Sequence, residues 1–307
     1  MLPKLAAQPA AEFVISTVDH EANVASWVFL ANTLNLTIKW WKPTDSSTNP
    51  HLTPESLKPL LSENTRLVTC THCSNLLGTI TDVQSIARLV HTIPEALLCV
   101  DGVAFAPHRP VDVKALEVDF YCFSWYKVYG PHVAQLYAIR ETQDRALTSL
   151  GHFFKEGWTL EEKLGLAGAS YELVQALPIV AGYSTKVGWE GIIKQEEDLQ
   201  EVLLGYLRSK PDVYKIWGEP TSDPKLRVPL VSFTVAGRGP KELVESIERK
   251  SNFGFRFGHM YSLRLVENVF NIDGAEGVVR ISMLHYNTIE EVKGFVEILD
   301  AEVCGAK

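Results

Sequence analysis

The sequence predicts an α/β fold in which a large domain with a mostly parallel sheet precedes a smaller α+β domain. Over the first part of the chain, short apolar segments rich in Val, Ile, Leu and aromatic residues alternate with helical patterns. Near-continuous apolar strands that alternate with helices are typical of a parallel sheet covered on both faces. The pattern changes after about residue 185, so we expect a large domain at residues 1–185 and a small C-terminal domain at residues 186–307.

Five strands and one clear helix are expected in the large domain. The helix follows Thr81, a candidate N-cap, and has apolar residues at the i, i+3, i+4, i+7 spacing of an amphipathic helix. These apolar residues are Val83, Ile86, Ala87 and Val90. The expected strands cover residues 12–17, 65–72, 96–101, 119–124 and 133–139.

A long amphipathic helix is expected at the start of the small domain. Its apolar side consists of Ile192, Leu199, Val202, Leu203, Tyr206 and Leu207. Two strands, around 228–237 and 277–284, and two helices, around 240–250 and 288–299, follow a Pro-rich and charged connection. This mixture of strands and helices predicts an α+β unit.

Composition excludes several classes of function. The 307 residues have a formal net charge of −8, and no cluster of Lys and Arg suited to nucleic acid is present. We therefore expect no nucleic-acid partner, and the absence of a long uncharged apolar segment argues against a membrane-spanning helix. The five cysteines are few and odd in number, which argues against a disulfide framework and favours a reducing, cytoplasmic compartment.

Polar side chains follow successive expected strands, at the edge where parallel sheets bind ligands. They are His20, Asn75, Asp101, Ser124 and Lys127. Any one of them alone would be interpreted as a solvated or capping residue. Because the carboxyl ends of parallel strands meet at one edge, the whole set indicates a site.

This set of residue types suits pyridoxal phosphate. That cofactor needs a lysine to hold its aldehyde as a Schiff base, and a carboxylate to keep its pyridine nitrogen protonated. Lys127 and Asp101 can supply both groups. His20, Asn75 and Ser124 are of the right types to cover the ring, to donate to the phenolate oxygen and to bind the phosphate. No metal is expected, because the His72–Cys73 pair has no second pair at ligand spacing.

The segment 100–132, "VDGVAFAPHRPVDVKALEVDFYCFSWYKVYGPH", resembles the signature of the class V aminotransferase family of fold type I, and the overall similarity is greatest to its cysteine desulfurase-like branch. In that family an Asp and a Lys at successive strand ends anchor the cofactor, here Asp101 and Lys127, which are 127 − 101 = 26 positions apart. The segments "STVDHEANVASW" and "SNLLGTITDV" resemble those that carry the ring-stacking histidine and the asparagine at the phenolate oxygen. The resemblance implies these roles for His20 and Asn75.

The C-terminal segment "VVRISMLHYNTIEEV" is similar to the closing motif of the same family, whose arginine holds the substrate carboxylate. The resemblance gives that role to Arg280, whose planar guanidinium can grip a carboxylate through two parallel hydrogen bonds. Considered alone, Arg280 would be interpreted as a surface or salt-bridge residue. The segment "RFGHMYSLRL" occupies the place of a substrate-facing loop, so His259 and Tyr261 are candidates either for tuning specificity or for ordinary packing.

The resemblance also indicates how the cofactor phosphate would be bound. It begins near residue 11, whereas family members usually begin with a further segment that binds the phosphate, so weaker cofactor binding is expected. Ser124 remains for the phosphate, and Tyr126 is a candidate contact. In the family a second subunit completes each site, so the resemblance implies a homodimer. The segment "GASYE" corresponds to the part that the second subunit contributes, and Ala169 stands where a threonine is expected. Ser170 is the candidate to replace that threonine.

Two departures concern the reaction. Desulfurases carry a loop cysteine shortly before the carboxylate-binding arginine, but no cysteine lies between residues 250 and 280. At the position where family members commonly have a Gln or His that contacts the cofactor, this sequence has Ala104.

The first hypothesis is therefore a pyridoxal-phosphate enzyme of the aminotransferase or lyase type that acts on an amino acid through Lys127. The alternative is a shortened, non-catalytic relative that serves as a binding or dimerisation module.

Overall fold

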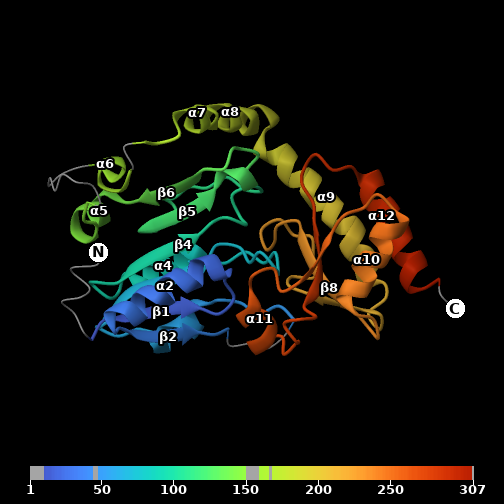
Figure 1. Cartoon of the computed structure of the whole chain (residues 1–307), viewed down its shortest axis with the longest axis horizontal. Coiled ribbons are helices and arrows are strands. Elements are labelled where there is room, and N and C mark those ends of the chain that lie inside the picture. Colours follow the sequence, from blue (N-terminus) through green and yellow to red (C-terminus); the bar gives the residue numbers. More distant parts are fainter. Residues whose placement is uncertain (1–9, 44–47, 150–158, 166–167, 306–307) are drawn as a thin grey trace.

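A six-stranded sheet forms the centre of the large domain (Figure 1). The computed structural model describes residues 10–43, 48–149, 159–165 and 168–305. In the strand order β2-β1-β3-β4-β5-β6, all neighbours are parallel except β5 and β6. The predicted mostly parallel sheet is confirmed, and one strand, β2, was not expected. The strands are β1 (Glu12–Ser16), β2 (Thr37–Trp41), β3 (Thr65–Thr71), β4 (Leu97–Asp101), β5 (Phe120–Ser124) and β6 (Ala134–Ala138).

Helices cover both faces of this sheet because alternate side chains of each strand point to opposite faces. In β1, Val14 packs with Ile86 of one helix, whereas Phe13 packs with Val24 of another. Each face therefore has its own apolar core. The covering elements are α2 (Glu21–Leu34), α3 (Pro54–Leu57), the 3₁₀ turn η1 (Lys58–Leu60), α4 (Val83–Val90) and α5 (Arg140–Ala146).

The expected helix at 83–90 is present, but its N-cap was misassigned. Asp82, and not Thr81, caps α4, because its Oδ1 accepts a hydrogen bond of 3.1 Å from the Ser85 backbone nitrogen. Asp82 is one residue closer to the helix than Thr81, so its carboxylate can accept from the free N–H groups of the first turn.

The small domain has a four-stranded antiparallel sheet in the order β7-β8-β10-β9. Three helices pack on one face of it and form a separate core. The α+β unit predicted for this region is present, with the two sheets lying on either side of residue 185; the exact boundary stays a prediction. Its elements are α9 (Trp189–Arg208), β7 (Tyr214–Trp217), β8 (Leu230–Val235), α10 (Pro240–Lys250), β9 (Arg256–Gly258), α11 (Leu263–Asn268), β10 (Val278–Ser282) and α12 (Ile289–Val303).

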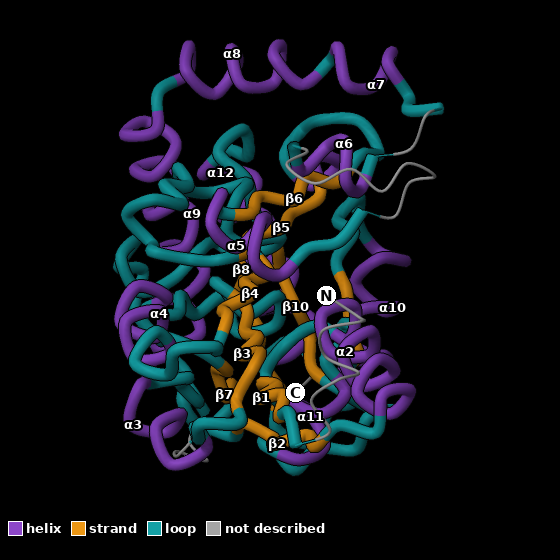
Figure 2. Tube along the Cα trace, turned by 90° about the vertical axis from the view of Figure 1, so that its left-hand side faces the viewer, coloured by secondary structure: helices purple, strands orange, loops and turns teal. Residues whose placement is uncertain are grey.

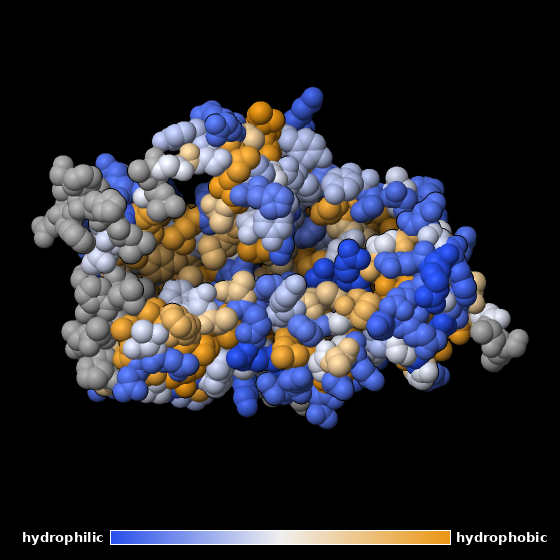
Figure 3. Space-filling model, viewed as in Figure 1, coloured by the Kyte–Doolittle hydropathy of each residue, from blue (hydrophilic) through white to orange (hydrophobic). Residues whose placement is uncertain are grey.

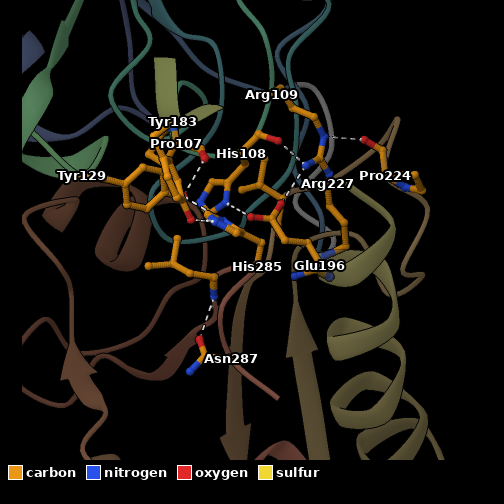
Figure 4. A network of polar contacts seen from close by, with 12 residues as sticks. Pro107, His108, Arg109, Tyr129, Tyr183, Glu196, Pro224, Arg227, His285 and Asn287 are labelled. Carbon is orange, nitrogen blue, oxygen red and sulfur yellow. Dashed lines mark hydrogen bonds and ion pairs between the residues drawn. The ribbon is translucent and has the colours of Figure 1, made fainter. Parts of the chain in front are cut away.

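A buried ionic cluster joins the two domains (Figure 4). Glu196 of α9 is fully buried, and its carboxylate contacts His108 Nδ1 and Arg109 Nη1, both at 2.8 Å. Two cationic or hydrogen-bonding partners compensate for the cost of burying one carboxylate. His108 thus has a structural role between the two domains.

A second part of the same cluster fixes the turn that follows β5. The Tyr129 hydroxyl donates a hydrogen bond of 2.9 Å to Pro107 O and lies 3.3 Å from His285 Nδ1. His285 Nε2 lies 2.6 Å from the Tyr183 hydroxyl, so residues of the large domain, the small domain and the helix before α9 meet here (Figure 4).

Two helices, α7 (Tyr171–Gln175) and α8 (Leu177–Val187), form an arm that lies along one border of the molecule (Figures 1 and 2). The short helix α6 (Leu160–Leu164) precedes them. Below α8 is a hollow of about 410 Å³, lined by Phe123, Trp125 and Val128 among others, and Figure 3 shows hydrophobic side chains there. The exposed apolar side chains of the arm are Tyr171, Leu173, Val174, Ile179, Tyr183 and Val187.

Within the described ranges, no helix has both the length and the apolar character needed to cross a membrane.

A pH-dependent ion pair between His91 and Asp119 is predicted directly before the start of β5, at the edge of the sheet away from Lys127. His91 Nε2 lies 2.9 Å from Asp119 Oδ2, and this hydrogen bond raises the pKa of His91 above 6.5. A histidine whose pKa is raised by folding stabilises the folded state at pH values below its unfolded-state pKa. This contribution is lost as the pH rises through the folded-state pKa. The His91 side chain is 38% exposed, so solvent screening limits the gain to about 0.5–1 kcal/mol.

We expect His91→Ala to lower the free energy of urea unfolding at pH 5.5 by more than it does at pH 8.5. At pH 5.5 Asp119 remains ionised, because its pKa is held below 3.8. An equal loss at both pH values would contradict the assigned pair.

Candidate functional site

The carboxyl ends of β1, β3, β4 and β5 meet at one edge, and the predicted polar residues follow them. After β5 the chain enters the 3₁₀ turn η2 (Trp125–Lys127). Trp125 O closes this turn by accepting hydrogen bonds of 2.8 Å from the backbone nitrogens of Val128 and Gly130. Tyr129 has a φ of 63°, a left-handed conformation that a tyrosine adopts only when its surroundings hold it.

Lys127 presents a free amine at this edge. Its side chain is exposed, and its Nζ lies 5.7 Å from the ring centroid of Tyr126. In the part of the chain that the structure describes, no hydrogen bond or ion pair engages its Nζ. The lysine is therefore available to react with a ligand.

Asp101 is a buried carboxyl near this lysine. It is 8% exposed, and its Oδ1 accepts a hydrogen bond of 2.8 Å from the Val103 backbone nitrogen. Burial raises the pKa of Asp101, while the positive charge of Lys127 opposes the shift. A cationic group placed against Asp101 would stabilise its charged form, as a protonated pyridine nitrogen requires.

Asp19 is a second buried carboxyl, which the sequence analysis missed. Burial, reinforced by the charge of Asp101, raises its pKa to about 7, although hydrogen bonds act against the shift. Its Oδ1 accepts 3.0 Å from the Thr71 backbone nitrogen, and its Oδ2 accepts 2.7 Å from Asn23 Nδ2. Asp19 fixes the backbone directly before His20 to β3, and its position next to His20 was the only signal for it.

His20 caps α2 and also borders the site. Its Nδ1 accepts a hydrogen bond of 3.0 Å from the Ala22 backbone nitrogen, so the capping role considered for an isolated histidine is present. Burial lowers the pKa of His20, and the nearby charges of Lys127 and Arg280 lower it further, whereas Glu21 raises it. A neutral imidazole here can lie against a flat ring without adding a charge.

Arg280 and Asn75 join the small domain to the site. Arg280 Nη1 donates a hydrogen bond of 2.9 Å to Asn75 O, and its buried Nε has no hydrogen-bond partner among the described residues. Burial lowers the pKa of Arg280, and the charge of Arg256 lowers it further. A buried guanidinium with a free donor is a ready partner for a carboxylate.

The loop between β9 and α11 closes this edge. Asn75 Nδ2 donates 2.8 Å to Met260 O, and Asn75 Oδ1 accepts 2.9 Å from the Ser262 hydroxyl. The amide of Asn75 is thus partly engaged by protein, which leaves one of its N–H groups for a ligand. His259 Nδ1 accepts 3.1 Å from the Tyr261 backbone nitrogen.

The candidate phosphate residues are not all brought together. Ser124 directly precedes η2, the turn that ends at Lys127, and its hydroxyl makes no capping hydrogen bond. Tyr126 stacks on His132, with ring centroids 5.1 Å apart. Ser170 lies exposed at the start of the α7–α8 arm and not among the strand ends. In the described segments, no group of three or more His, Cys, Asp or Glu residues could hold a metal ion.

The chain matches a known protein family over nearly all of its length. The family model described as "Aminotransferase class-V" matches residues 2–295. The chain is 50% identical over 296 residues to the aminotransferase-like protein FGM3 of Gibberella zeae, covering 95% of this chain and 73% of that protein. It is 48% identical over 293 residues to the cysteine desulfurase-like protein ustD of Aspergillus flavus, covering 94% of this chain and 67% of that one.

Two solved structures have the same fold. The cysteine desulfurase CsdA of Escherichia coli has a TM-score of 0.83 at 22% identity, covering 98% of this chain and 73% of that chain. The apo cysteine desulfurase of Thermococcus onnurineus has a TM-score of 0.81 at 24% identity, covering 99% of this chain and 78% of that chain. At these sequence identities the similarity supports only a shared fold.

Proposed function

Because this chain belongs to the class-V aminotransferase family, in its cysteine desulfurase-like branch, we propose that it is a pyridoxal-phosphate-dependent enzyme acting on an amino acid. One observation carries the proposal. The charge of Lys127 acts on the pKa values of both Asp101 and His20, and the charge of Arg280 acts on the pKa of His20, which supports one site shared by these residues.

The residues fit this cofactor. Pyridoxal phosphate, when bound, supplies an aldehyde that reacts with an amine and a protonated ring that withdraws electrons. Asp101 would keep the ring nitrogen protonated, His20 would pack on the ring, and Asn75, Ser124 and Tyr126 would contact its oxygen atoms. Lys127 Nζ would hold the cofactor and then take and return the α-proton of the substrate.

The loop near Arg280 limits the reaction. It has no thiol between residues 250 and 280 that could accept sulfur, so transfer to a loop cysteine is not part of the proposal. Transamination, elimination, racemisation and decarboxylation share the same attachment of the amino acid to the cofactor and differ in which bond at Cα stands perpendicular to the ring. The five cysteines are free, in keeping with a reducing, cytoplasmic compartment.

The proposal is tested with the purified chain and added pyridoxal phosphate. We expect a visible absorption band and, after reduction with borohydride, a cofactor adduct on the peptide that contains Lys127. Screening amino acids for release of ammonia, pyruvate or a keto acid then identifies the reaction. An adduct spread over surface lysines, with none enriched at Lys127, would refute the proposal.

The carboxylate role of Arg280 makes a separate prediction. Lysine keeps the charge but lacks the planar fork, so Arg280→Lys should raise the dissociation constant of the amino acid by roughly 10–100-fold. Arg256→Lys is the matched control, because Arg256 lies opposite Arg280 in the β9–β10 pairing but has a side chain that is 72% exposed. Spectral titration of the cofactor-loaded proteins measures both, and equal effects would contradict the assignment.

A homodimer is the proposed assembly, supported by the exposed apolar arm. A second copy that covered α7 and α8 would bury apolar surface that is otherwise in contact with water. It would also bring Ser170 from one subunit toward the other, as the family resemblance implies. The same surface supports the alternative of a non-catalytic dimerisation module. Light scattering tests the assembly, and a strict monomer at micromolar concentration would count against it.

A further inference from the structure

The loop that closes the site contains two consecutive strained residues. Met260 and Tyr261 have φ angles of 48° and 61°, in the left-handed region that residues other than glycine rarely adopt. Each such residue is strained and persists only where the surroundings hold it. Two in succession at a candidate site require an explanation.

Hydrogen bonds from two predicted site segments hold this conformation. Met260 O accepts from Asn75 Nδ2 at 2.8 Å, and Tyr261 O accepts from the Glu21 backbone nitrogen at 2.7 Å. An ion pair between Arg264 and Glu21 attaches the start of α11 to the start of α2. The loop backbone is therefore fixed both to the segment after β3 and to the segment after β1.

The fixed backbone places the Tyr261 ring in the open next to His20. The two ring centroids are 5.3 Å apart with planes tilted by 38°, and Tyr261 is 68% exposed. Its hydroxyl has no hydrogen-bond partner in the described part of the chain. Core packing does not explain a strained loop that leaves a large aromatic side chain exposed, because burial normally stabilises such a residue.

We propose that Tyr261 is a specificity residue whose ring contacts the side chain of the amino acid substrate. The assignment rests on the proposed function, since His20 is the residue expected on the cofactor ring. His259 then acts as a positioning residue, because its Nδ1 accepts from the Tyr261 backbone nitrogen. Arg280 holds the carboxylate, so the end of the substrate that remains for Tyr261 is its side chain.

The test measures dissociation constants of the twenty proteinogenic amino acids by spectral titration of the cofactor-loaded protein. Tyr261→Ala should reduce the preference for the best-bound amino acid over glycine by about tenfold, because glycine has no side chain to contact. Tyr261→Phe keeps the ring and should keep the preference within about threefold. Phe29→Ala is the matched control, since Phe29 is a 74% exposed aromatic residue of α2.

Nitration with tetranitromethane provides a readout without activity. The best-bound amino acid should protect Tyr261 from nitration but not Tyr286, which is 60% exposed. Unchanged preference in Tyr261→Ala, or equal losses for glycine and larger amino acids, would overturn the assignment while the Lys127 adduct remained. Absence of that adduct in the wild-type protein would overturn the proposed function and this assignment with it.

Discussion

Replacing Lys127 with alanine is expected to abolish both the visible absorption of the cofactor-loaded protein and its turnover of amino acids. The Lys127 amine is free, exposed and close enough to Asp101 and His20 to affect the pKa of each. Loss of proton transfer alone should lower the rate by about 10²–10⁴-fold. Loss of the covalent link to the cofactor adds to this effect.

The measurement compares wild type, Lys127→Ala and Lys114→Ala after reconstitution and dialysis. Lys114 is a suitable control because it is also an exposed lysine of the large domain. We expect Lys114→Ala to keep the band, the adduct and the activity. Retention of the band in Lys127→Ala would mean that the cofactor reacts with another amine, and the site would have to be reassigned. Circular dichroism establishes that both variants fold.

Local patterns made the strand-end residues predictable. Asp101 and Lys127 follow strongly apolar segments, and the carboxyl ends of parallel strands share one edge. The structure brings Lys127 near both Asp101 and His20, while Asn75 meets Arg280 across the domain interface. Their proposed roles still depend on the family and on the tests described above.

Long-range contacts could not be predicted in the same way. The strands β2, β7 and β9 have three to five residues and lie at sheet edges, where a short segment carries little periodic signal. The role of Asp19 depends on Thr71, which is 52 positions away. The strain at Tyr261 is a backbone property that no residue type announces. The polar residues expected for the phosphate are separated because Ser170 belongs to the arm.

The domain interface next to Asn75 is also invisible in the sequence, and it depends on glycine. Gly218 follows β7 with a φ of 96°, and a Cβ atom there would lie 2.2 Å from Leu77 O. Its backbone nitrogen also donates 2.7 Å to Thr48 O. A backbone carbonyl cannot move aside as a flexible side chain can, so any larger residue must displace the segment that carries Asn75.

We expect Gly218→Ala to lower the free energy of urea unfolding by roughly 2–5 kcal/mol, the sum of left-handed strain and overpacking. Gly237→Ala separates these causes, because Gly237 also has a left-handed φ, of 72°, but no atom within 4 Å of its Cβ position. Strain alone should cost that variant about 1–2 kcal/mol. Equal losses in the two variants would show that the contact with Leu77 O has no cost. A larger loss at Gly218, accompanied by weaker cofactor binding, would show that the fit between the domains positions Asn75 and Arg280 for the site.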